Sequence, residues 1–326
     1  KERTNETVDE TPIETQGYEP GIKDTSMHHF LHPAFDFDDG QLGFWMAKFE
    51  PSVANENEPC YIEPSIENCD NSNLIVRFVP NAKTWRFISI SNAYKIATKL
   101  NTNKDVYGWL LGEVDSHMMT NHEWGAVAYL SKSKYGAHEE EVWNNAFTGF
   151  VTGCSGPNVD AANVATCVEY NTENGEKAST THNIYGIYDM SGGAWENVMG
   201  NANYLEKTSG FTNHELTSLV DKHISRYYSN PENWLNDIGM TYDEFSYGDA
   251  VYETSFGAGR YNGSSWIGKE AGAWYGDRSF LLHLNNPWFN RGGQRAYGTI
   301  TGIFHFTSAG GEGYVNNSFR LTLSHN

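Results

Sequence analysis

Two carboxylates that bracket a pair of glycines are the residues of this chain best placed to do chemistry. The run 183–196 reads NIYGIYDMSGGAWE, with Asp189 before and Glu196 after Gly192–Gly193. Residues 184–188 predict a short strand, the glycines a tight turn at positive φ, and Trp195 a second strand with its ring in the core. The two carboxylates and several carbonyl groups would then lie close together. Such a group suits a structural hydrogen-bond network, a calcium ion or catalysis.

The same run resembles a family signature. It is similar to NxYGLxDMxGNVWEW of the formylglycine-generating-enzyme-like branch of the C-type lectin fold, with matches at Asn183–Met190 and Trp195–Glu196. It departs at Gly193, where the enzymes have Asn, and at Asn197, where they have Trp. The GGAWE form looks more like the ligand-displaying relatives, which include variable proteins of diversity-generating retroelements. The resemblance implies that the two carboxylates tie loops together or hold a structural calcium ion.

The catalytic sets of this branch are missing. An oxidase like the formylglycine-generating enzyme needs a copper-binding Cys pair after its RGG strand, because copper(I) requires soft thiolate ligands. Here no Cys follows Arg291–Gly293, and the last one is Cys167. Iron oxygenases like the sulfoxide synthases need a His/His/Glu set, and the spacing of His117, His122 and Glu123 does not match it. Because these residues are missing, we assign no catalytic residue. A metal-dependent oxidase or oxygenase is the alternative interpretation.

The C-terminal segment favours a binding role. In the retroelement-diversified relatives, variable residues of this segment point outward from a rigid scaffold. The resemblance implies that ten residues here face a ligand, and their side chains offer adaptable hydrogen bonds and flat contact area. The ten are Asn290, Gln294, Arg295, Tyr297, Thr299, His305, Thr307, Ser308, Tyr314 and Asn316. The alternative is that they form ordinary polar loops.

Composition and charge exclude several classes of partner. The chain has 326 residues and a formal net charge of −19. Because phosphate binding needs clustered Lys and Arg, we expect neither nucleic acid nor an anionic membrane as partner. No run of 18 apolar residues occurs, so no membrane-spanning helix and no direct membrane insertion are expected. The 32 glycines and 14% aromatic residues are typical of a domain with many loops and short strands.

The four cysteines form two local pairs. Cys60 and Cys69 are nine residues apart, and Cys154 and Cys167 are thirteen apart. Neither pair has CxxC spacing, and no His pair stands at zinc-finger distance. We predict two local disulfides in an exported protein; four free buried thiols in a cytosolic protein are the alternative. The chain begins at Lys1 without Met, which we interpret as processing or trimming.

The rest of the chain predicts how these residues are positioned. Residues 1–26 are polar and almost free of large apolar side chains, so we expect a flexible tether or stalk. Residues 27–326 are predicted to form one α+β domain of the C-type-lectin-like fold. It would contain two helices, short antiparallel strands and long loop insertions, the largest at about 200–285.

Two amphipathic helices are predicted. The first covers 92–100 with Ser91 as its N-cap. The second begins at Thr120, which has capping-box spacing to Glu123, and buries Trp124. Alternation of apolar residues and the family resemblance predict strands over 43–50, 288–292, 302–306 and 318–323.

These observations predict a non-catalytic receptor-binding or adhesion protein, and the resemblance implies that its binding surface is open to diversification. The partner would be a cell-surface protein or glycan, and the location extracellular, on a virion, a tail fibre or a bacterial surface appendage. No cofactor is required, although structural calcium is possible at Asp189 and Glu196. A homo-oligomer is expected because relatives often trimerise to multiply weak contacts, and residues 1–26 would attach the domain to a larger assembly.

Overall fold

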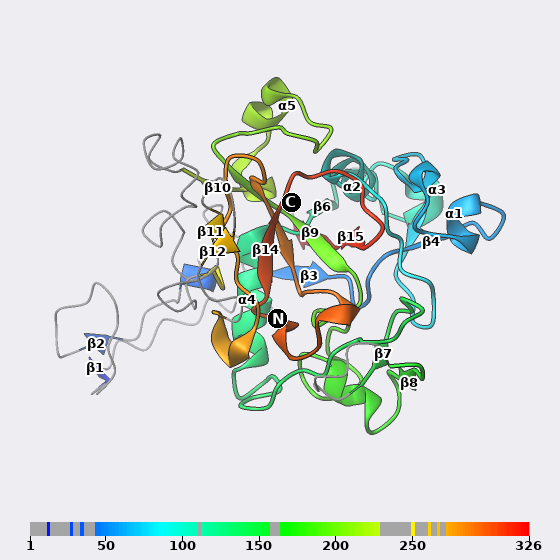
Figure 1. Ribbon diagram of the computed structural model, residues 1–326. Helices are drawn as coiled ribbons and strands as arrows, with labels where there is room; N and C mark the ends of the chain where they lie inside the picture. The colour runs from blue at the N-terminus through cyan, green and yellow to red at the C-terminus, as the bar shows by residue number, and fades with distance from the viewer. Residues whose placement is uncertain are drawn as a thin grey trace.

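The structure is a computed structural model, shown in Figure 1. It describes residues 12–13, 27–28, 33–35, 43–109, 112–156, 164–228, 249–251, 260–261, 266–267 and 272–325. Most of the predicted tether and residues 229–248 of the predicted insertion lie outside the described residues.

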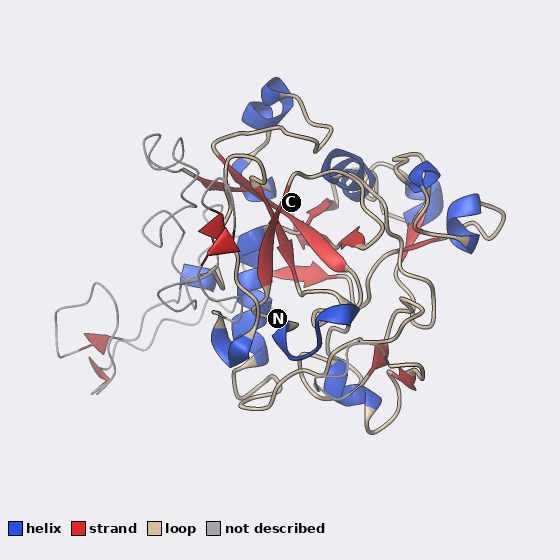
Figure 2. Cartoon of the chain, in the orientation of Figure 1, coloured by secondary structure: helices blue, strands red, loops and turns tan. Residues whose placement is uncertain are grey.

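The described part of the chain is a mixed α+β structure with short elements joined by long loops (Figure 2). The α-helices are α1 Pro59–Ile62, α2 Ile90–Thr98, α3 Lys104–Tyr107, α4 Asn121–Ser131 and α5 Asn213–Ser218. The 3-10 helices are η1 Pro33–Phe35, η2 Glu67–Cys69, η3 Gly175–Ala178, η4 Asp221–His223, η6 Trp274–Gly276 and η7 Arg295–Ile300. The strands are β1 Pro12–Ile13, β2 Met27–His28, β3 Phe44–Met46, β4 Ser52–Val53, β5 Val76–Arg77, β6 Val114–Met118, β7 Cys154–Ser155, β8 Val168–Glu169, β9 Trp195–Ala202, β10 Ser225–Tyr227, β11 Arg260–Tyr261, β12 Trp266–Ile267, β13 Trp288–Arg291, β14 Phe306–Ala309, β15 Asn317–Phe319 and β16 Leu321–His325.

A five-stranded sheet runs through the centre of the molecule (Figure 1). Its order is β10-β9-β13-β14, and β15 also pairs with β9. The strand β13 is antiparallel to its two neighbours, whereas β10 and β15 run parallel to β9. The expectation of antiparallel strands is therefore correct only in part. The strand β10 lies inside the predicted insertion and still belongs to the central sheet.

Each face of the central sheet carries its own hydrophobic core. Successive side chains of a strand point to opposite faces. Accordingly Val198 of β9 packs into a core with Trp124 of α4, whereas Met199 packs into a core with Ile96 of α2. Helices α4 and α2 therefore cover opposite faces of the sheet, and this explains why almost every residue of β9 is buried.

The C-terminal strands connect the central sheet to a second sheet. The predicted strand 318–323 is two strands, because Arg320 interrupts it: β15 pairs with β9, and β16 lies between β3 and β6. Since β3 comes early in the described chain and β16 ends it, this second sheet joins the two ends of the domain. The predicted strand 43–50 is reduced to β3.

The two predicted helices are present as α2 and α4, with one change in capping. The expected number of two is too low, because the described residues also form the short helices α1, α3 and α5. Helix α4 begins with the predicted capping box, in which the Thr120 side chain accepts from the Glu123 N–H and the Glu123 side chain accepts from the Thr120 N–H. The N-cap of α2 is Ser89 instead of Ser91, which lies inside the helix. Asp70 holds Ser89 in place by accepting from its N–H (2.8 Å) and its hydroxyl (2.7 Å).

The predictions for 302–306 and 184–188 are wrong. Residues 301–305 form a turn in which the His305 N–H bonds Gly302 O (3.0 Å), and only Phe306 enters β14. Residues 183–186 also turn, with the Gly186 N–H bonded to Asn183 O (3.2 Å). In both segments a turn replaces extended backbone. The Phe304 N–H bonds the Asp277 carboxylate (2.9 Å) and the Tyr188 N–H bonds Lys48 O (2.8 Å), so the alternating apolar residues did not produce a strand.

Two disulfides confirm the predicted cysteine pairing. Cys60–Cys69 links α1 to η2, and Cys154–Cys167 closes the loop between β7 and β8. Each bridge joins residues close together in the chain, as the local spacing of the cysteines indicates.

Candidate functional site

The glycine turn at 192–193 is built as predicted, and its first carboxylate is buried. Gly192 and Gly193 have φ of 81° and 70°, and Asp189 itself has φ of 63°. The Asp189 carboxylate accepts from the Gly153 N–H (2.9 Å) and from the Asn145 side-chain amide (2.9 Å). Asp189 therefore fastens the turn to the loop that carries Cys154.

The second carboxylate forms a buried ion pair. Glu196 accepts from Arg320 Nε at 2.6 Å and from a second guanidinium nitrogen, and both side chains are fully buried. Arg320 also donates to Ala47 O (2.8 Å) and Tyr188 O (3.0 Å). Burial by itself lowers the pKa of Arg320, but the Glu196 carboxylate outweighs it and raises that pKa, so the guanidinium stays charged.

Glu50 completes this group, and sequence reasoning missed it. Its carboxyl group accepts from the Thr84 hydroxyl (2.5 Å) and from the Ala194 N–H (2.9 Å). Burial, and then the neighbouring Asp189 and Glu196, raise the pKa of Glu50 well above its ordinary value. We refer to Glu50, Asp189, Glu196 and Arg320 as the buried carboxylate network.

The donor set of this network does not fit the calcium ion expected at Asp189 and Glu196. Calcium binds six to eight oxygen ligands. Here the oxygens of Asp189 face N–H donors, and those of Glu196 face a guanidinium group, which a cation would have to displace. The contacts are those of the hydrogen-bond network that the sequence left open as one alternative.

Four of the ten residues expected to face a ligand are buried. Asn290, Thr307 and Ser308 lie on β13 and β14, and His305 lies in the turn before β14. The expectation of outward side chains fails because cores cover both faces of the central sheet. His305 is fully buried beside Ile300 O (3.0 Å from Nδ1), and burial lowers its pKa to about 3, so it is neutral.

The other six residues lie at the surface. They are exposed or half-buried and lie in η7, at its N-cap or in the loop before β15. The six are Gln294, Arg295, Tyr297, Thr299, Tyr314 and Asn316. The two segments meet at Trp195. Its N–H bonds Asn316 O (2.8 Å), and its ring lies 5.4 Å from that of Tyr297. Trp195 is half-buried and so belongs to this surface, whereas the sequence predicted a core residue.

Arginine side chains stack on aromatic rings across the same region. The guanidinium groups of Arg86 and Arg295 lie 3.9 and 4.6 Å from the centre of the Phe150 ring. That of Arg278 lies 4.7 Å from the centre of the Tyr297 ring. Arg86 also donates to Val315 O (2.7 Å), in the loop that carries Tyr314 and Asn316. Separate segments of the chain therefore converge here.

We call Arg86, Trp195, Arg278, Arg295 and Tyr297, with the loop 314–316, the arginine–aromatic surface. Each of its named side chains is half-buried. Sequence reasoning missed Arg86 and Arg278 because no local pattern shows that residues so far apart in the chain meet. The fold also brings three arginines together in a chain with a net charge of −19, and composition alone does not indicate such a cluster.

A second polar group lies elsewhere and could hold a metal ion. Asp115, His117 and His223 bring ligand atoms together, a set that the sequence did not predict. The sequence places His117 near His122 and Glu123. In the structure Glu123 Oε1 contacts His117 Nε2 (3.0 Å), whereas His122 contacts the Ser225 hydroxyl (3.3 Å) and is not a member of the group.

Comparison with known proteins does not extend the family resemblance. Neither a scan against models of protein families nor a search of curated proteins found a match to this chain. Within the described residues, every helix is too short or too polar to cross a bilayer.

Proposed function

We propose that the chain is a non-catalytic receptor-binding or adhesion protein with a C-type-lectin-like fold. Its ligand would be a cell-surface protein or glycan, and the arginine–aromatic surface would contact it. Of the ten residues predicted to face the ligand, the six at the surface remain candidates and the four buried ones do not. Arg86, Trp195 and Arg278 join the candidate binding surface.

One observation carries this proposal: half-buried aromatic and guanidinium groups from distant segments of the chain meet at one place on the surface. Trp, Tyr and Arg are the residue types that most often dominate binding energy at interfaces, because they combine large flat contact area with directed hydrogen bonds. Trp195, Tyr297 and Arg278 also restrain one another by ring and cation–π contacts. Side chains restrained in this way lose less entropy when a ligand binds.

The scaffold beneath supports the same role. The Arg295 N–H bonds Gly193 O (3.0 Å), and the Trp195 N–H bonds Asn316 O (2.8 Å), so the backbone of the surface is attached to the glycine turn. The buried carboxylate network holds the glycine turn through the contacts of Asp189 and Glu50. A rigid frame that carries side chains of adaptable chemistry is typical of display proteins.

The disulfides are compatible with an extracellular location. We propose a virion, a tail fibre or a bacterial surface appendage as the site of display. Residues 1–26 would attach the domain there, and several copies would raise the avidity of weak contacts. No cofactor is needed for this function.

A binding screen of the purified full chain on glycan arrays and bacterial cells tests the proposal. We expect binding that Trp195→Ala reduces by at least about tenfold, in the range of an interface hot spot. Tyr185→Ala is the matched control, because Tyr185 is 89% exposed and lies outside this surface. Equal loss of binding in both variants, or turnover of an oxidisable substrate with bound copper or iron, would overturn the proposal.

A further inference from the structure

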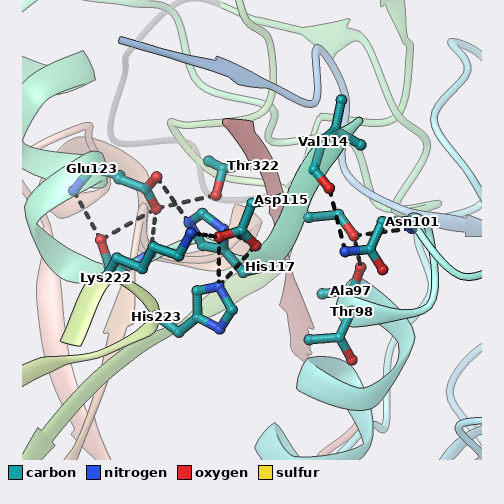
Figure 3. A network of polar contacts seen from close by, with 12 residues as sticks. Ala97, Thr98, Asn101, Val114, Asp115, His117, Glu123, Lys222, His223 and Thr322 are labelled. Carbon is teal, nitrogen blue, oxygen red and sulfur yellow. Dashed lines mark hydrogen bonds and ion pairs between the residues drawn. The ribbon is translucent and has the colours of Figure 1, made fainter. Parts of the chain in front are cut away.

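Two histidines and an aspartate converge at β6, a strand of the second sheet (Figure 3). Asp115 and His117 are two residues apart on β6, so both side chains lie on the same face of that strand. His223 reaches them from η4, more than 100 residues later in the chain. One ligand atom of each residue lies within 4.8 Å of the other two.

The distances suit a single ion between the three side chains. His223 Nε2 is 2.8 Å from Asp115 Oδ1, and His117 Nδ1 is 3.6 Å from the same oxygen. Two ligands that each lie about 2.1 Å from a tetrahedral zinc ion are roughly 3.4 Å apart. Small side-chain rotations would therefore bring the three atoms into a coordination shell.

Each imidazole is oriented through its other nitrogen. His117 Nε2 contacts Glu123 Oε1 at 3.0 Å, and His223 Nδ1 contacts the Tyr94 hydroxyl at 3.0 Å. Metal-binding histidines almost always have such an outer partner, which sets the tautomer and directs the free nitrogen at the ion. Glu123 is itself held by the Thr120 capping box and by the Thr322 hydroxyl (3.1 Å).

The remaining nitrogen of His117 is a second, independent indication of a ligand. His117 is 1% exposed, and its Nδ1 atom is buried without a hydrogen-bond partner. Leaving a polar atom unsatisfied in the interior costs about 1–3 kcal/mol. This atom points at Asp115, where a bound ion would satisfy it.

We propose that Asp115, His117 and His223 form a binding site for a divalent transition-metal ion of the zinc class. Imidazole nitrogens suit zinc, copper and nickel, whereas calcium and magnesium prefer oxygen ligands alone. The site differs from the buried carboxylate network and from the arginine–aromatic surface in all its residues. Its role is structural, because the ion would tie η4 to β6 at a place where His117 has no access to solvent.

Lys222 must be accommodated in this site. Its ammonium group contacts Asp115 Oδ2, which also lies 3.0 Å from His223 Nε2, while Oδ1 lies 2.8 Å from His223 Nε2 and 3.6 Å from His117 Nδ1. Metal binding at Oδ1 leaves that contact geometrically possible, with Lys222 holding the other carboxylate oxygen. Its positive charge opposes a second cation, but its side chain is 33% exposed and can turn toward solvent.

Titration of the chelator-treated full chain with Zn²⁺ by calorimetry tests the site, with Ca²⁺ as the comparison ion. We expect one Zn²⁺ per chain, no Ca²⁺ at this site, and an unfolding midpoint raised by roughly 5 °C at about 100-fold excess over Kd. Titration with Co²⁺ gives a visible absorption band that reports the coordination geometry directly.

His223→Phe is the informative variant, because it keeps a ring to stack on His117, whose ring centre lies 4.6 Å away. His214→Ala is the control, since His214 is an exposed residue of α5. His223→Phe should abolish the Zn²⁺-dependent shift, and His214→Ala should keep it. No stoichiometric Zn²⁺ binding by the wild type, or equal binding by both variants, would overturn the proposal. If His223→Phe does not fold, Asp115→Asn replaces it with the same two outcomes.

Discussion

Arg320 and Arg295 show how the same side chain serves two regions of this molecule. Arg320 is fully buried, and its guanidinium donates to Glu196, Ala47 O and Tyr188 O. Arg295 is half-buried and stacks on the Phe150 ring. The first arginine is held by directed hydrogen bonds in one geometry. The second is held by a ring face, which constrains its plane far less.

The buried carboxylate network and the arginine–aromatic surface are physically connected. The glycine turn at 192–193 lies between them, and its Gly193 carbonyl accepts from the Arg295 N–H. Variation at the surface would leave the turn intact because the surface side chains contribute little to the network below. Changes in the network, in contrast, should alter both regions. The predictions below follow this difference from its largest expected effect on stability to its smallest.

Arg320→Met should be the most damaging change. It removes the cation from a buried pair and leaves Glu196 beside Glu50 and Asp189 without a positive charge. Breaking a buried ion pair typically costs about 3–5 kcal/mol. Urea unfolding measures this loss, and the double variant Glu196→Gln/Arg320→Met should recover part of it. A single-variant cost below about 1 kcal/mol would contradict the role given to the pair.

Gly192→Ala should cost less, and it has a close control. An added Cβ at Gly192 would lie 1.7 Å from Asn144 Oδ1, and φ there is 81°. Gly276 has almost the same φ, 80°, but nothing lies within 4 Å of its Cβ position. Gly276→Ala therefore reports backbone strain alone, about 1–2 kcal/mol. We expect Gly192→Ala to exceed it by about 1–3 kcal/mol, the range of overpacking; equal melting temperatures would show that the turn can relax.

Asp277 should make stability fall as pH rises. Burial raises its pKa from 3.8 to about 8, and the Phe304 N–H (2.9 Å) only partly opposes this. Because the folded-state pKa is the higher one, its contribution to stability is fully present below about pH 4. It is lost as pH rises toward 8, by up to about 1.4 kcal/mol per pH unit.

Asp277→Asn isolates this contribution, since other groups also titrate in this range. The variant should flatten the decline in unfolding free energy between pH 5 and pH 8, measured by urea titration at each pH. All other titratable groups are the same in the wild type and the variant, so the difference between the two pH profiles reports Asp277. Parallel curves for the two proteins would show that Asp277 is ionised in the folded state at neutral pH.

Local chemistry was the part of the fold that the sequence could predict. The Thr120–Glu123 capping box, the two disulfides and the positive φ of Gly192 and Gly193 depend on residues close together in the chain. In each of these features, two or three residues close together in the sequence determine the local conformation, because their groups interact directly with each other.

Properties that depend on distant segments could not be predicted. At the break between β15 and β16, Arg320 pairs with Glu196, which is more than 100 residues away in the chain. The burial of Asn290 and His305 depends on cores that cover both faces of the sheet. The i, i+2 spacing of Asp115 and His117 on a strand was a local signal for a ligand pair. The third member, His223, had no signal in its own neighbourhood.

Tyr314→Ala should have the smallest effect on stability. Comparing it with His305→Ala shows which of the two residues belongs to the surface and which to the scaffold. Tyr314 is 50% exposed, so its truncation should change the unfolding free energy by no more than about 0.5 kcal/mol. His305 was predicted to be equivalent, but it is fully buried and its ring lies 6.3 Å from that of Tyr297. His305→Ala should therefore cost about 2 kcal/mol or more, as truncation of a buried side chain does. Equal unfolding curves for the two variants would mean that the turn at 301–305 opens easily, and that the ligand surface extends to His305 as the sequence predicted.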